Sequence, residues 1–191
     1  MEPRDLSDHE EYVAGRGIEE VARELGKDPD ELITLSSNEN PLGPSPAAVA
    51  AIREFADEVH QYPKAVHTDL TDAIAGKWGV DSSQVWLAPG GDGALDYLAR
   101  AMLVPGDSVL VPEPGFAYYG MSARFHHARV NTYRLAPEDD FELSAPVVLE
   151  AADQHRIVYL TSPHNPTGGR FSVSEVEQIA RETSRDTLVI V

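Results

Sequence analysis

The segment 157–170, IVYLTSPHNPTGGR, decides the fold. It opens with a mostly apolar run that is typical of a strand buried in a parallel sheet. Two prolines, an asparagine and two glycines follow, so a turn with both rigid and freely rotating positions comes directly after the strand. Residues 174–183 then have the pattern of a helix, which Ser172 or Ser174 can cap. Strand, loop and helix in this order indicate an α/β fold.

The same alternation continues through most of the chain. Because several predicted strands are apolar throughout, we expect a largely parallel sheet covered on both faces, a three-layer α/β/α sandwich. An N-terminal arm precedes it, with a short helix that ends at Gly26. The predicted strands are 85–89, 108–113, 130–135, 157–162 and 187–191, and the predicted helices are 18–25, 46–59, 68–78, 93–103, 117–126, 146–153 and 174–183.

The composition excludes several classes of protein. With 42% hydrophobic residues the chain is globular, and no apolar run nears the roughly 20 residues that span a bilayer. The acidic start, MEPRDLSDHEEY, lacks the apolar core of a secretory signal. Without cysteine, disulfides and thiolate metal sites are excluded, and the histidines lack the spacing of metal ligands. We therefore expect a cytoplasmic protein without a metal site.

Acidic residues dominate the charge. Asp and Glu number 32 against 15 Lys and Arg, which gives a net charge of −17, and the only lysines are Lys27, Lys64 and Lys77. Such a surface repels nucleic acid and anionic membranes. It also keeps a protein hydrated when salt screens its self-repulsion. We interpret it as an adaptation to a high-salt cytoplasm; an ordinary acidic enzyme is the alternative.

Ligands of open α/β sheets bind outside the carboxyl ends of the strands, and three loops at this edge carry candidate groups. In the first, Gly90, Gly91 and Asp92 precede a helix, where close backbone approach and free N–H groups favour an anion such as phosphate. A plain tight turn is the alternative there. In the second, Phe116 offers an aromatic face for a flat ligand, unless it and the neighbouring tyrosines belong to the core or an interface.

The third loop is the one in the opening segment. Pro163 and Pro166 restrict its backbone, and the bond between Asn165 and Pro166 is a candidate cis peptide. Asn165 then carries a hydrogen-bonding amide on a rigid mount. Together the three loops indicate a site for a planar, polar, phosphorylated ring. His164 is expected to be structural.

The loop has a recognisable pattern. SPHNPTG (162–168) resembles the S-P-x-N-P-T-G segment of fold-type-I pyridoxal-phosphate aminotransferases. LSSNENPLGPSP (35–46), HQYPK (60–64), the Gly-Gly-Asp turn and PGFAYYGMSA (114–123) follow the order expected for the histidinol-phosphate aminotransferase branch. The resemblance implies a homodimeric enzyme that uses pyridoxal phosphate to transfer an amino group between L-histidinol phosphate and 2-oxoglutarate.

The resemblance also implies roles for single residues. Gly90, Gly91 and Asp92 would bind the cofactor phosphate, Phe116 would stack on its ring, and Asn165 would hydrogen-bond the 3′ oxygen.

Four further residues would approach the site from elsewhere. Tyr62 would reach the cofactor phosphate of the partner subunit, while Tyr12, Asn38 and Asn40 would lie near the substrate.

Other residues that the family requires are missing from the chain. These are an Asp-x-x-Tyr segment and the Schiff-base lysine, and none of the three lysines has the right sequence context. We therefore expect the 191 residues to be the amino-terminal part of a longer enzyme and to be inactive alone. Residues 1–45 would form an arm and a substrate-side loop of the small domain, and residues 46–191 an incomplete cofactor-binding large domain.

Several alternatives share the same loops. A pyridoxal-phosphate-dependent decarboxylase of a phosphorylated amino acid has the same fold and cofactor, and so do other class I aminotransferases. A non-catalytic binding module on this scaffold is a further alternative. A Rossmann dinucleotide-binding protein is disfavoured, because no G-x-G-x-x-G follows the first strand.

Overall fold

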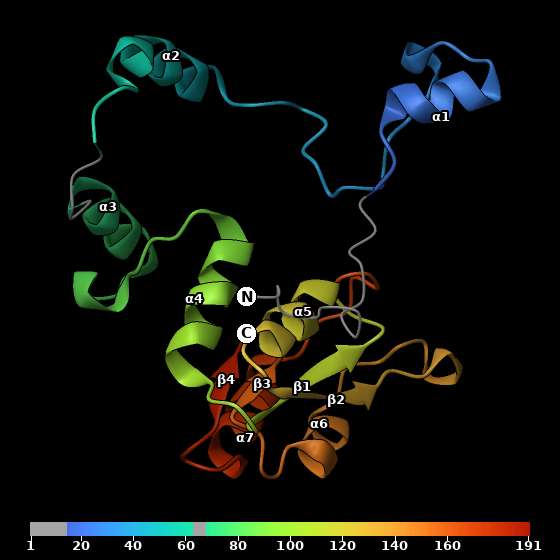
Figure 1. Ribbon diagram of the computed structural model, residues 1–191, viewed down its shortest axis with the longest axis vertical. Helices are drawn as coiled ribbons and strands as arrows, with labels where there is room; N and C mark the ends of the chain where they lie inside the picture. The colour runs from blue at the N-terminus through green and yellow to red at the C-terminus, as the bar shows by residue number, and fades with distance from the viewer. Residues whose placement is uncertain (1–14, 63–67) are drawn as a thin grey trace, which may run out of the picture. The chain divides into compact units, whose positions relative to one another are not determined.

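The computed structural model describes residues 15–62 and 68–191, which form two compact units (Figure 1). The first contains the described residues up to Trp86, and the second contains residues 87–191. The predicted domain boundary between residues 45 and 46 falls inside the first unit, and that functional division stays a prediction. Tyr12 lies outside the described residues.

The described part of the first unit contains three α-helices: α1 (Ile18–Leu25), α2 (Pro46–Phe55) and α3 (Thr68–Trp78). As predicted, α1 ends at Gly26, which adopts a left-handed conformation with φ of 62°. α2 begins at Ser45, whose hydroxyl accepts a hydrogen bond from the Ala48 N–H. Short 3₁₀ turns follow the three helices, at Pro29–Glu31, Ala56–Glu58 and Ser82–Gln84.

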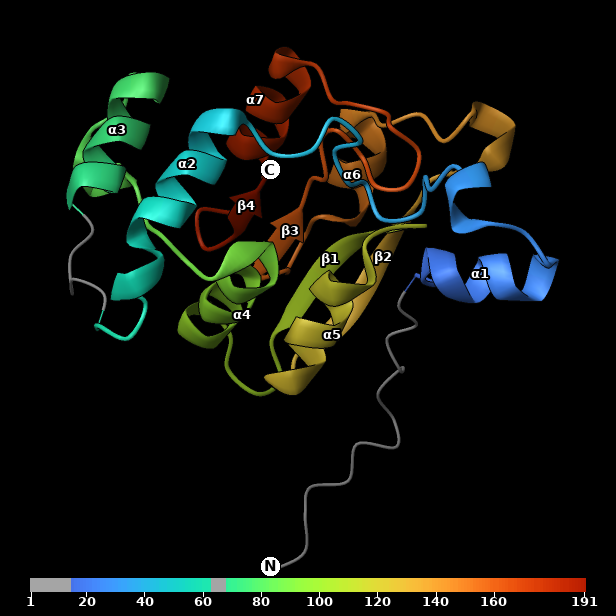
Figure 2. The ribbon, with the colours of Figure 1, turned by 90° about the horizontal axis from the view of Figure 1, so that it is seen from above.

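The second unit is built on a four-stranded parallel sheet (Figure 2). Its strands lie in the order β2-β1-β3-β4, so β1 and β3 are central neighbours. Because all strands point the same way, their carboxyl ends meet at one edge, as predicted. The bounds are β1 (Ser108–Glu113), β2 (Arg129–Arg134), β3 (Ile157–Tyr159) and β4 (Leu188–Ile190).

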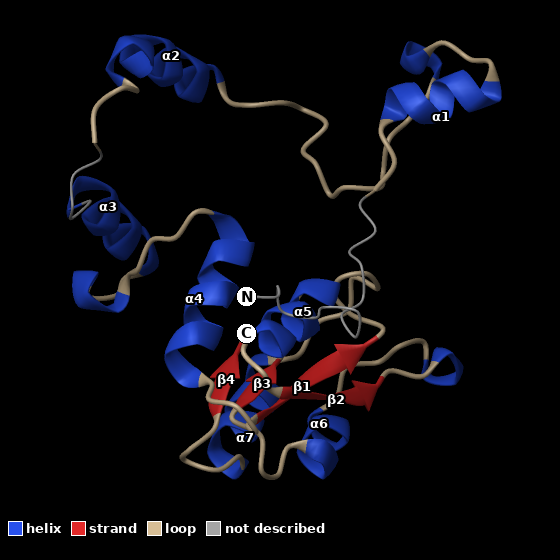
Figure 3. Ribbon diagram, viewed as in Figure 1, coloured by secondary structure: helices blue, strands red, loops and turns tan. Residues whose placement is uncertain are grey.

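Helices cover both faces of this sheet (Figure 3). α4 (Gly90–Met102) and α5 (Ala117–Phe125) pack on one face against Val109, Ile157 and Tyr159. α6 (Ala145–Ala151) and α7 (Val173–Glu182) pack on the other. Successive residues of β1 and β3 therefore point into different cores, which confirms the three-layer prediction and explains why these strands are apolar throughout.

One predicted strand is wrong. Residues 85–88 are irregular and pair with no described strand, and the Trp86 side chain is 55% exposed. An apolar run becomes a strand only when a neighbouring strand accepts and donates its backbone hydrogen bonds, and composition cannot supply that partner. α4 also begins at Gly90 rather than at residue 93, because the Gly-Gly-Asp turn already belongs to its first turn.

A tyrosine hydroxyl completes the bonding between β1 and β3. Their pairing ends at Leu110 and Val158, and Pro112 in β1 has no N–H to offer. The carbonyl of Tyr159 instead accepts a hydrogen bond of 3.0 Å from the Tyr133 hydroxyl, which reaches it from β2. Both tyrosines are at most 2% exposed, so the bond satisfies a carbonyl that water cannot reach.

These two tyrosines predict a loss of stability in alkali. Burial, followed by the proximity of Tyr119, raises the pKa of Tyr159 to about 12 and the pKa of Tyr133 well above its usual value. The folded chain therefore retains phenolic protons that the unfolded chain releases above about pH 10. Stability is fully present below that pH and falls as the pH rises towards 12, by up to about 1.4 kcal/mol per pH unit for each phenol.

Tyr133→Phe should remove one of these protons and the bond to the Tyr159 carbonyl. We expect a free energy of unfolding lower by about 1–3 kcal/mol at pH 8 and a shallower decline above pH 10, both measured by urea unfolding. Tyr62→Phe, at a side chain that is 99% exposed, is the control. An equal decline in Tyr133→Phe and wild type would contradict the assignment.

Candidate functional site

Three glycines at the start of α4 have different requirements. Gly90 needs its positive φ of 78°, and its N–H bonds the Ala88 carbonyl at 2.8 Å. A Cβ on Gly93 would lie 2.8 Å from Cγ of Pro89, so this position is sterically closed. A Cβ on Gly91 would meet no atom within 4 Å, and its φ is ordinary. The fold thus requires Gly90 and Gly93 but leaves Gly91 free.

Gly91 opens onto a cavity of about 420 Å³ beside the carboxyl edge of the sheet. The first turn of α4 supplies Gly91 and Asp92, so unpaired helix N–H groups lie at the cavity wall. The remainder of the wall is mainly apolar and aromatic. Residues lining it also include Ala94, Leu95, Leu98, Phe116, Tyr119, Tyr159, Leu160, Ile190 and Val191.

The aromatic side of the cavity is a connected set of rings. Phe116 precedes the first turn of α5 and forms a T-shaped contact with Tyr119, at a centroid distance of 5.4 Å and 86°. Tyr119 stacks on Tyr159 at 4.5 Å and 20°, and its hydroxyl accepts a hydrogen bond of 3.1 Å from Thr161 Oγ1. Tyr119 packs on the core, and both Phe116 and Tyr119 line the cavity; the role of Phe116 as a stacking face stays a prediction.

Tyr118 contacts the Phe116 ring more loosely than Tyr119 does, with ring centroids 6.4 Å apart. Burial raises the pKa of the Tyr118 hydroxyl, and the carboxylates of Asp96 and Asp92 add to the shift.

The loop after β3 holds Asn165 in a short, closed turn. The His164 N–H bonds the Gly169 carbonyl, the Gly168 N–H bonds the His164 carbonyl, and the peptide bond from Asn165 to Pro166 is cis, as predicted. Within the described part of the chain the half-buried Asn165 side chain makes no hydrogen bond, so its amide is available to a ligand. Asn165 is not among the residues lining the cavity.

His164 stabilises this turn. Its ring is 2% exposed and Nδ1 lies 2.8 Å from Thr167 Oγ1. Burial lowers the pKa of the imidazole, although the Pro114 carbonyl opposes the shift. A buried, neutral ring that bonds within its own loop has the structural role that we predicted.

The other predicted residues belong to the first unit or lie outside the described residues. Asn40 forms a local turn: its side chain accepts a hydrogen bond from the Leu42 N–H and donates one to the Gly43 carbonyl. Asn38 has a positive φ of 52°, and Tyr62 is 99% exposed. Tyr12 is not described. The roles of these four residues stay predictions.

Sequence reasoning missed one residue that lines the cavity, Tyr159, and one that bonds the Tyr119 hydroxyl, Thr161. Tyr159 and Thr161 stand inside the opening segment, but an apolar strand pattern does not reveal which face each side chain takes. The alternation of side chains along a strand could have placed Tyr159, because it puts Tyr159 on the same face as Ile157. Both residues pack towards α4 and α5.

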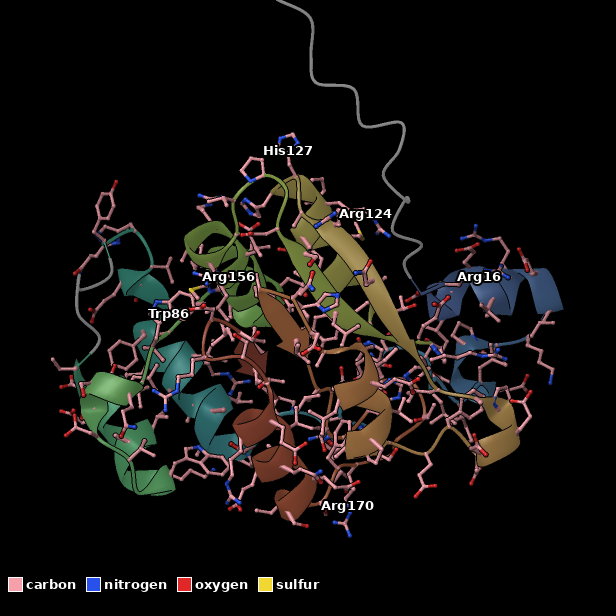
Figure 4. All side chains as sticks on the ribbon, turned by 90° about the horizontal axis from the view of Figure 1, so that it is seen from below. Arg16, Trp86, Arg124, His127, Arg156 and Arg170 are labelled. Atoms are coloured by element: carbon pink, nitrogen blue, oxygen red, sulfur yellow. The ribbon has the colours of Figure 1, made fainter. Side chains whose placement is uncertain are left out.

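A polar hollow of about 560 Å³ lies at the opposite, amino edge of the sheet. Its Arg156, labelled in Figure 4, donates hydrogen bonds to the carbonyls of Met102 and Asp186. His155 is satisfied by the Ala152 carbonyl and the Asn131 amide. These groups join the ends of the strands. By contrast, Arg170 extends outward from the loop before α7 (Figure 4).

Within residues 15–62 and 68–191, no group of three His, Cys, Asp or Glu side chains could hold a metal ion. No helix in the same described ranges is both long and apolar enough to cross a membrane.

The comparisons with known proteins agree with this geometry. The family model for aminotransferase class I and II matches residues 30–191. The chain belongs to this family. It is 66% identical over its whole length to histidinol-phosphate aminotransferase of Halobacterium salinarum, and 64% identical to that of Halorubrum lacusprofundi, and it covers 52% of each relative.

Among solved structures, histidinol-phosphate aminotransferase from Sinorhizobium meliloti, in complex with pyridoxal-5′-phosphate, superposes with a TM-score of 0.78 at 25% identity. That match covers 93% of this chain and 47% of the other. The fold is therefore that of the aminotransferase family. The chain spans about half the length of the curated relatives it matches.

The glycines give a test of which positions the fold requires. Gly93→Ala should lower the free energy of unfolding by about 1–3 kcal/mol, because its Cβ overlaps Pro89. Gly91→Ala should leave it unchanged or raise it by up to about 1 kcal/mol, because alanine favours a helix and the space is open. Urea unfolding measures both. Equal losses would mean that Gly91 is also a structural glycine.

Proposed function

We propose that the full-length protein is a pyridoxal-phosphate-dependent aminotransferase that acts on L-histidinol phosphate and 2-oxoglutarate. One observation carries the proposal: a cavity at the carboxyl edge of the sheet joins a helix N-terminus to an aromatic ring, in a chain 66% identical to a histidinol-phosphate aminotransferase. A volume of about 420 Å³ is within the range of small-ligand pockets.

Residues at the cavity, together with Asn165 in the loop after β3, suit this cofactor. The N–H groups of Gly91 and Asp92, with Gly90 beside them, would bind the phosphate, and Gly91 leaves the space that the phosphate needs. Phe116 would stack on the pyridine ring, and Asn165 would donate its amide N–H to the 3′ oxygen. When bound, pyridoxal phosphate supplies the electron sink for bond breaking at the substrate Cα.

Further parts of the proposal rest on the chain's surface and on its resemblance to the family. In a homodimer, Tyr62 would reach the partner's cofactor phosphate, while Tyr12, Asn38 and Asn40 would lie near the substrate. The net charge of −17 supports a high-salt cytoplasm and argues against nucleic-acid or membrane partners.

The test uses the full-length protein. We expect pyridoxal phosphate to bind with a visible absorbance band, and L-histidinol phosphate plus 2-oxoglutarate to yield glutamate. Gly91→Val should weaken cofactor binding at least tenfold while the protein stays folded, because its side chain would fill the phosphate space. Release of carbon dioxide from a phosphorylated amino acid would indicate the decarboxylase instead. Cofactor binding without either reaction would indicate a binding module.

Asn165→Ala tests the third loop. Because the turn is closed by backbone bonds and by His164, we expect folding to be retained. Loss of a hydrogen bond to the 3′ oxygen should shift the pH dependence of the visible absorbance of the bound cofactor and lower kcat about tenfold or more. Thr167→Val, which changes the His164 contact, is the matched control. An unchanged spectrum and unchanged kinetics in Asn165→Ala would remove Asn165 from this role.

A further inference from the structure

Phe116 lies where the loop after β1 enters α5, and its ring contacts the rings of Tyr118 and Tyr119. It stands just before α5, its side chain is half-buried, and its contact with Tyr118 is loose. A ring in this position can tilt unless another side chain holds its edge. Since stacking depends on the orientation of both rings, whatever holds Phe116 also sets the quality of the stacking face.

Tyr119 supplies this support through two contacts, one with β3 and one with the segment directly after it. Its ring stacks on Tyr159, a strand residue that is 1% exposed, and its hydroxyl accepts the hydrogen bond from Thr161. Tyr119 also meets Phe116 in a T-shaped contact at a centroid distance of 5.4 Å and 86°, a favourable aromatic geometry. Through Tyr119, the orientation of the Phe116 ring therefore depends on the sheet rather than on the end of α5.

We propose that Tyr119 is a positioning residue of the cofactor site. By packing on β3, it fixes the orientation of the Phe116 ring that would stack on the cofactor. The inference rests on the proposed function. It implies that one strand sets two contacts with the cofactor, because β3 also leads directly to the loop that carries Asn165. A shift of β3 would then move the Phe116 ring and the Asn165 amide together.

The test measures cofactor affinity and orientation in the full-length protein. Tyr119→Leu should raise the dissociation constant for pyridoxal phosphate about threefold to tenfold, the range expected when an aromatic pair is lost. It should also reduce the visible circular dichroism per bound cofactor by about half, because the bound ring is held less firmly. Tyr119→Phe retains both ring contacts and should fall between Tyr119→Leu and wild type. Val148→Ala, buried on the opposite face, is a control for lost stability alone.

A double-mutant cycle tests whether Tyr119 acts through Phe116. In a Phe116→Leu background, Tyr119→Leu should change the dissociation constant by less than about twofold. Fully additive losses would overturn the proposal, and so would a Tyr119→Leu protein with wild-type affinity and circular dichroism. If Tyr119→Leu does not fold, Thr161→Val and Tyr119→Phe serve instead. Each should raise the dissociation constant about twofold without adding to the other, and no change in either would overturn the proposal.

The proposed function can fail separately. A wild-type protein that binds no pyridoxal phosphate overturns both proposals, whereas wild-type binding with an unaffected Tyr119→Leu overturns only the role of Tyr119.

Discussion

The parallel pairing of β1 with β3 determines where chemistry can occur in this protein. It brings the carboxyl ends of two central strands to one edge, where β1 leads to Phe116 and β3 leads to Asn165. Because Pro112 cannot continue the ladder, the pairing also requires the hydroxyl of Tyr133 to satisfy the Tyr159 carbonyl. Strand β3 is short, yet it pairs with both neighbouring strands, and its last residue, Tyr159, lines the cavity.

Tyr159 connects stability with the cavity. Its carbonyl completes the sheet, while its ring forms part of the cavity wall and supports Tyr119. The same burial that makes the ring a firm support raises the pKa of its phenol, so rigidity of the site and sensitivity to alkali have one cause.

At the start of α4, two glycines are required by the fold, whereas a third glycine between them is not. Gly90 and Gly93 are fixed by backbone conformation and by contact with Pro89, whereas Gly91 is free of both constraints and faces the cavity. Since the unpaired N–H groups of a helix attract an anion without a basic side chain, the phosphate site that we propose at this turn is compatible with a chain net charge of −17. The backbone dipoles would act on a phosphate at contact distance, whereas solvent and salt screen the effect of the more distant surface charges.

The amino-acid sequence by itself determined the α/β class, the helix end at Gly26, a serine cap for the helix after the SPHNPTG loop, and the loops that carry the candidate site. Those features are local: a cap, a glycine or an S-P-x-N-P-T-G segment acts through neighbouring residues. Only the tertiary structure decided that residues 85–88 remain unpaired and that Tyr133 replaces the donor that Pro112 lacks. It also decided that Tyr159 and Tyr119 support Phe116. Each of these depends on which segments meet in space, and a strand pattern carries no information about its partner.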